Sequence, residues 1–218
     1  RTGYRRAGSA VTLRPDVLAS RLGTVTFIAD LLTATADRPA RLNCFGMHEW
    51  AMVYRSREVR HNGVPLRLDP DHTDQVLESM PLRCSHFDAY RFFTDAAAGR
   101  NAEQLSRDAQ LRHEQPGCVH ANMDLYKWCY KLGPLVPSEM LMDCFELACT
   151  ARLLDMRASP YDLTGYGITP IRIETTSGRT DYVRHQQEVA RRAAELRTAL
   201  RDHCRGMIAR DRAERVPG

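Results

Sequence analysis

Apolar side chains recur at helical spacing near the C-terminal end of the chain, and this repeat constrains the fold more than any other feature. Its members mark one face of a helix over residues 180–209: Tyr182, Val183, Val189, Ala193, Leu196, Leu200, Cys204 and Met207. Charged residues cover the other face. The pattern therefore predicts a long amphipathic helix that packs on other helices.

Other segments extend this picture to the whole chain. Helical spacing predicts further helices over residues 16–35, 48–54 and 138–157, the last capped by Ser138. Residues 171–174 alternate and predict a short strand, whereas residues 56–72 and 95–116 are polar and predict long loops. The expected fold class is mainly α, a compact helical domain with a small β element. We expect a single globular domain over residues 1–209 and a frayed polar tail over residues 210–218.

Composition narrows the class of protein. The chain has 218 residues, 43% of them hydrophobic and 27% charged, which fits a globular domain and excludes disorder and a disulfide miniprotein. No run reaches the roughly 18 apolar residues of a membrane span, so no membrane partner is expected. Seven cysteines without an export signal predict a reduced, cytoplasmic protein. The net charge of +4 permits nucleic-acid binding without requiring it.

Three short segments share a composition that indicates chemistry. Residues 44–50, 84–88 and 117–124 each place a histidine with a carboxylate among apolar or aromatic residues. The pairs are His48 with Glu49, His86 with Asp88, and His120 with Asp124. Histidine and carboxylate are costly to bury unless they are paired or bind a metal. We therefore expect the three segments to meet in one pocket.

Spacing indicates which side chains can act together. His120 and Asp124 share a helical face, and His86 and Asp88 would share a face of an extended segment. His48 and Glu49 are adjacent, so both are not expected to face one site. Two or three of the histidines with Asp88 or Asp124 resemble the ligand set of a divalent transition metal. The alternative is that the carboxylates only orient core histidines.

Cysteine offers two further possibilities, both disfavoured. Cys84 and Cys118 each precede a histidine by only two positions, tighter spacing than zinc chelates usually show. A Cys118 nucleophile would need a lowered thiol pKa, for which the sequence gives no sign.

Aromatic and cationic residues near the three segments are candidates for substrate binding. Trp50, Tyr126 and Trp128 could stack on a flat ligand such as a nucleobase, or else pack in the core. Arg157 could clamp an anionic substrate, or else pair with Asp162 at the end of its helix.

Long motifs in the chain resemble a known family. They are LNCFGMHEWAMVYR at residues 42–55, RCSHFDAYRFF at 83–93, EQPGCVHANMDLYKWCYK at 114–131 and LDMRASPYDL at 154–163. The chain resembles the actinobacterial family usually named 3-methyladenine DNA glycosylase. The resemblance covers most of the chain and implies that it is the C-terminal part of a longer family member.

Three functions follow as hypotheses. The resemblance implies an N-glycosidic hydrolase of alkylated purines, in which Asp124, or Glu49 in second place, would stabilise the sugar cation or activate water. The first alternative is a metal-dependent enzyme on a small molecule, and the second is a ligand-binding module without catalysis. Duplex DNA binding is expected to be weak, because acidic residues interleave the arginines of the C-terminal helix.

Overall fold

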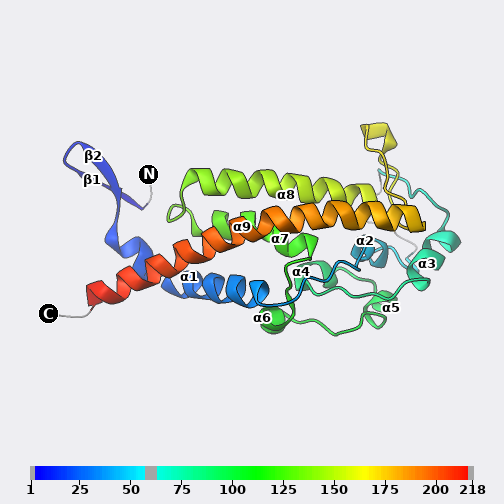
Figure 1. Ribbon diagram of the computed structural model, residues 1–218, viewed down its shortest axis with the longest axis horizontal. Helices are drawn as coiled ribbons and strands as arrows, with labels where there is room; N and C mark the ends of the chain where they lie inside the picture. Colours follow the sequence, from blue (N-terminus) through cyan, green and yellow to red (C-terminus); the bar gives the residue numbers. More distant parts are fainter. Residues whose placement is uncertain (1–2, 57–62, 216–218) are drawn as a thin grey trace.

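Four long helices form the body of the protein. The computed structural model describes residues 3–56 and 63–215. The bundle consists of α1 (Pro15–Ala36), α7 (Val119–Leu132), α8 (Ser138–Ala158) and α9 (Thr176–Arg215). Helix α9 packs against the other three, and α7 packs against α8 (Figure 1). The predicted mainly α fold is confirmed.

The C-terminal helix is longer at both ends than its apolar repeat predicts. Most members of the repeat are buried, as expected: Tyr182, Val189, Ala193, Leu200, Cys204 and Met207. The helix begins at Thr176 and continues through Arg215, so residues 210–215 of the expected tail are helical. Asp211 in that extension is buried, which shows that the bundle still covers it. Residues 216–218 of the tail lie outside the described residues.

The β element is not where the sequence predicted it. Residues 171–174 form an irregular segment, and their alternation arises because Ile171 and Ile173 anchor that segment in the core. In the part of the chain that the structure describes, the one sheet is an antiparallel hairpin of β1 (Tyr4–Ala7) and β2 (Ala10–Leu13). Nearly all of its residues are exposed, so no alternation of burial marks it in the sequence.

Short helices gather beside one end of the bundle (Figure 1). They are α2 (Met47–Ala51), α3 (Pro70–Glu78), α4 (Phe87–Tyr90), α5 (Asp95–Ala98), η1 (Arg107–Ala109), α6 (Gln110–His113) and η2 (Thr164–Tyr166). The predicted loop over residues 95–116 therefore contains three of them, and it buries Ala97, Leu105 and Ala109. Helix α3 likewise starts inside the predicted loop over residues 56–72, of which residues 57–62 lie outside the described part.

Helix α8 confirms the predicted extent but not the predicted cap. It begins at Ser138, and the flanking Pro137 makes no side-chain capping bond.

One helix bears on the expectation that the chain has no membrane span. Residues Asp16–Ala36 of α1 are long and apolar enough to cross a membrane by length and composition. Val25, Ile28 and Leu31 of this stretch are fully buried in the core. Core helices of globular proteins can be equally long and apolar, so length and composition do not decide between a membrane and a protein core.

Candidate metal centre

The three histidine segments converge, as predicted. His48 comes from α2, His86 precedes α4, and His120 lies in the first turn of α7. The ring centroids of His48 and His120 are 4.3 Å apart, and those of His86 and His120 are 5.3 Å apart. His120 therefore joins two neighbouring groups of side chains.

The first group is a triad of His48, His120 and Asp155, with one donor atom of each within 4.8 Å of the others. His48 Nε2 lies 2.7 Å from Asp155 Oδ1, and both side chains are buried. The two groups form an ion pair when His48 is protonated, and neither of these atoms has a hydrogen bond to another of the described residues. An imidazole nitrogen and a carboxylate oxygen are both donor atoms that transition metals bind. Two such atoms side by side are suited to share a cation.

Asp155 was missed by the sequence analysis. It lies on α8 between Leu154 and Ala158, in the face that packs into the core, and it has no exposed surface. A carboxylate on the apolar stripe of a helix is the signal that could have found it.

Glu49 lies closer to the first triad than expected. Its Oε1 atom is 3.9 Å from His48 Nε2, although adjacent residues were not expected to face one site. Arg152 joins them, because its Nη1 donates to Glu49 at 3.0 Å and to Asp155 at 2.8 Å. The short helix α2 is fully buried, so both neighbouring side chains point into the protein.

The second group is a triad of His86, Glu114 and Asp124. His86 Nε2 lies 3.0 Å from Asp124 and 3.4 Å from Glu114. Glu114, which the sequence analysis missed, also accepts a hydrogen bond from Gln110 at 2.6 Å. Lys127 pairs with Asp124, so this triad already contains one positive charge. His120 and Asp124, predicted to share a face of one helix, belong to different triads.

Asp88 belongs to neither triad. It accepts hydrogen bonds from Arg107 at 2.5 Å and Lys127 at 3.1 Å. Burial alone would raise the pKa of Asp88, but these two cations outweigh it and hold the pKa well below its usual range. The predicted pairing with His86 is wrong because α4 begins at Phe87, so the two side chains do not share a face of an extended segment.

Glycine allows α2 to bring His48 into the cluster. Gly46, directly before the helix, has a φ of +71°, a conformation that favours glycine. A Cβ atom there would also lie 3.1 Å from the Cβ of Ala158 on α8. The close approach of α2 to the end of α8 thus depends on this residue.

The charges of the first triad are strongly coupled. Burial alone would raise the pKa of Asp155, but His48 outweighs burial and the pKa is lowered. Burial would lower the pKa of His48, but Asp155 outweighs it and the pKa is raised. For His120, burial and the neighbouring His48 both act downward and lower the pKa to about 3. His120 is therefore neutral near pH 7, the state in which imidazole binds a metal.

This arrangement predicts a pH dependence of the metal-free protein. Between about pH 6.5 and pH 3, unfolded His120 takes up a proton that the folded state refuses. The raised pKa of His48 keeps its ring protonated over this pH range in both the folded and the unfolded state. Asp155 lowers the unfolding free energy further only below about pH 3.9. The unfolding free energy should fall as pH falls, measured by urea titration with EDTA. His120→Gln should flatten the fall and the exposed control His72→Gln should not; equal slopes in all three proteins would contradict this.

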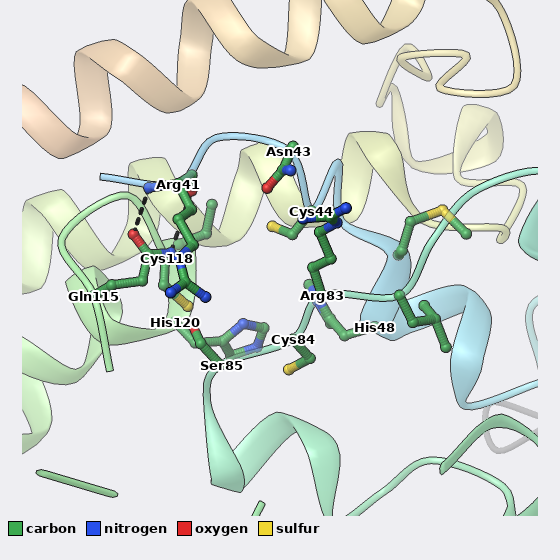
Figure 2. A pocket seen from close by; sticks show the side chains of 13 residues that line it. Arg41, Asn43, Cys44, His48, Arg83, Cys84, Ser85, Gln115, Cys118 and His120 are labelled. Atoms are coloured by element: carbon green, nitrogen blue, oxygen red, sulfur yellow. Dashed lines mark hydrogen bonds between the residues drawn. The ribbon is translucent and has the colours of Figure 1, made fainter. Parts of the chain in front are cut away.

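A pocket lies against the first triad. His48 and His120 line it together with three thiols, Cys44, Cys84 and Cys118 (Figure 2). Burial raises the pKa of Cys84 to about 12 and raises that of Cys118 as well. In the metal-free protein the thiols of Cys84 and Cys118 are therefore protonated, the state in which a cysteine is a weak nucleophile.

The predicted substrate-binding residues do not line this pocket. Trp50 has no exposed surface, and its indole N–H donates to the Ala158 carbonyl at 2.9 Å. Trp128 is also in the core, where its ring contacts Phe27 edge-on. The other two predicted residues, Tyr126 and Arg157, make contacts with nearby side chains and backbone.

Tyr126 packs against Phe145 with ring centroids 5.2 Å apart. Arg157 donates from Nε to the Thr169 carbonyl at 3.1 Å. The expected pairing of Arg157 with Asp162 is not the one found, because Asp162 accepts from Thr164.

Searches with this chain against protein-family profiles, curated proteins and solved structures find no match.

Proposed function

We propose that the protein is a metal-dependent enzyme that acts on a small molecule and holds a divalent transition metal ion on His48, His120 and Asp155. One observation supports this most strongly. His48 Nε2 and Asp155 Oδ1 are buried 2.7 Å apart beside His120, and neither atom has a hydrogen bond to another of the described residues. A shared metal ion would satisfy both atoms, and two histidines with one carboxylate are a common ligand set of catalytic metals.

The position of the triad suits catalysis better than a structural role. Three protein ligands leave coordination positions open, whereas structural sites are closed by four. His48 and His120 line the pocket, so a water molecule in the pocket can reach those positions. A metal ion bound there would polarise a substrate oxygen or activate water. Arg152, which bonds both Asp155 and Glu49, would keep the carboxylate ligand oriented.

The second triad is proposed as a weaker site. Its Glu114 is engaged by Gln110, and none of its three residues lines the pocket that His48 and His120 line. We expect one equivalent of metal to remain after desalting and a second to bind only in excess metal, measured by elemental analysis and calorimetry. His86→Ala should remove the second event and keep the first. His72→Ala, which breaks a surface histidine–aspartate pair, should keep both.

A different stoichiometry would contradict this assignment. Protein purified without added chelator that retains no metal, and that binds none on titration, would overturn the proposed function. Equal loss of the first event in His86→Ala and His48→Ala would show that the triads are one site.

N-glycosidic hydrolysis is the second candidate, and one observation favours it. Asp124, the first choice of carboxylate for this reaction, lies in the buried cluster beside His86. The buried positions of Trp50 and Trp128 argue against base stacking on them. Release of base from alkylated DNA that persists in EDTA and is lost in Asp124→Asn would support this candidate over the first.

A further inference from the structure

The pocket beside the first triad continues into an outer hollow with a basic wall. The two share Arg41, Arg83, Cys84 and Ser85. The outer hollow holds about 760 Å³, part of it open to solvent, and Arg38 and Arg112 also line it. A molecule that enters from this side passes the arginines before it reaches His48 and His120.

Three of these guanidinium groups have no acidic partner. Among the described residues, no carboxylate forms an ion pair with Arg41, Arg83 or Arg112, whereas arginines such as Arg67, Arg107 and Arg152 do pair with acids. Arg38 differs, because it donates to the carbonyl oxygens of Ala34 and Glu114 at 2.7 and 2.9 Å. The one carboxylate in the wall, Glu103, lies 2.5 Å from His113.

Arg41 is held in place although its side chain is exposed. The buried Gln115 side chain accepts from the Arg41 backbone N–H at 2.8 Å and donates to the Arg41 carbonyl at 3.2 Å (Figure 2). Gly117 lies so close that a Cβ atom there would be 2.6 Å from that carbonyl oxygen. The backbone that carries this arginine is therefore fixed at the pocket.

Arg83 is held by a second buried amide. Asn101 accepts from the Cys84 backbone N–H at 2.8 Å and donates to the Cys84 carbonyl at 3.1 Å. Leu82, on the other side of Arg83, forms an isolated β-bridge with Asn101. Two irregular segments are thus pinned so that each presents an unpaired arginine to one pocket (Figure 2).

The arginines of α9 contrast with this wall. Arg184 pairs with Asp181, Arg191 with Glu188, and Arg201 with Asp202. Arg192, Arg205 and Arg210 of the same helix are in no ion pair among the described residues, but acidic residues interleave the arginines of α9. Arg41 and Arg83 instead line one hollow that leads to the triad.

We propose that Arg41 and Arg83 bind the phosphoryl group of a small phosphorylated substrate whose reacting end lies at His48 and His120. This inference rests on the proposed function for the identity of the reacting end. Guanidinium groups form paired hydrogen bonds with the oxygens of a phosphate. The charges of two such groups match those of a phosphate dianion, whereas a carboxylate carries only one negative charge.

The test uses metal-free protein, so that the metal cannot bind the probe. Binding of inorganic phosphate and of glycerol 3-phosphate is measured by calorimetry at fixed ionic strength, with acetate and a DNA duplex as further probes. Arg41→Gln and Arg83→Gln should each weaken phosphate binding about ten- to a hundred-fold. Arg210→Gln removes the same charge from the exposed end of α9 and should change nothing.

The outcomes separate this inference from the proposed function. Loss of phosphate binding in both variants, with metal binding unchanged, would support it. Phosphate that binds the wild type and a variant with both Arg41→Gln and Arg83→Gln equally, or that does not bind the wild type, would overturn it even if the metal site is real. Acetate that binds as tightly as phosphate would assign a carboxylate ligand instead. Tighter binding of duplex DNA than of glycerol 3-phosphate would assign nucleic acid, and either result would overturn the proposal.

Discussion

Asp155→Asn should lower the affinity for the first metal ion by about a hundred- to a thousand-fold and abolish metal-dependent turnover. Four-ligand zinc sites bind with roughly 10–16 kcal/mol, which is about 2.5–4 kcal/mol for each ligand. Asparagine keeps the shape of the side chain but removes the charge that lies 2.7 Å from His48. Arg152 retains its bond to Glu49, so the substitution leaves one partner for that cation. Calorimetric titration with the metal that copurifies measures the loss.

Asp143→Asn is the matched control for this change. Asp143 lies on the same helix but is exposed, so the substitution removes an equal charge without touching the cluster. Near-wild-type metal affinity is expected for it. If Asp155→Asn bound metal as well as Asp143→Asn, Asp155 would not be a ligand.

Trp50→Ala should reduce the unfolding free energy by about 3–5 kcal/mol, the usual cost of deleting a large aromatic side chain from a core. Trp50 is fully buried, and its indole donates to the Ala158 carbonyl beside the end of α8. Trp50→Phe keeps most of the packing and should cost much less. Urea unfolding, followed by far-ultraviolet circular dichroism, measures both.

Phe145→Ala serves as the control for aromatic deletion, because Phe145 is 42% exposed and should change stability far less than Trp50→Ala. A substrate-stacking role for Trp50 would give the opposite pattern. In that case Trp50→Ala would weaken substrate binding while the unfolding free energy stayed near that of the wild type.

The long helices could be predicted because each carries a continuous apolar face. The repeat ending at Met207 identifies α9, although not its last turns, where polar residues such as Asp211 are covered by the bundle. The hairpin of β1 and β2 could not be predicted, because exposed strands leave no alternation in the sequence. The irregular segment at residues 171–174 has the sequence pattern of a strand because the buried Ile171 and Ile173 are separated by one exposed residue.

The centre of the site was predictable from residue type and its partners were not. Three histidines near carboxylates indicated a shared pocket, and their rings do meet. The nearest carboxylates in sequence were poor guides, because Asp88 turns away with α4 toward Arg107. Asp155 and Glu114 reach the histidines only through the packing of distant segments. The histidines of the site can therefore be identified from the sequence, whereas the carboxylates beside them are determined by the tertiary structure.

Anomalous diffraction from crystals of the protein with its copurified metal tests the central claim most directly. The account predicts the strongest anomalous peak between His48, His120 and Asp155, at about 2.0–2.3 Å from one donor atom of each. The absence of a peak there, or a strongest peak bound by other side chains, would contradict it.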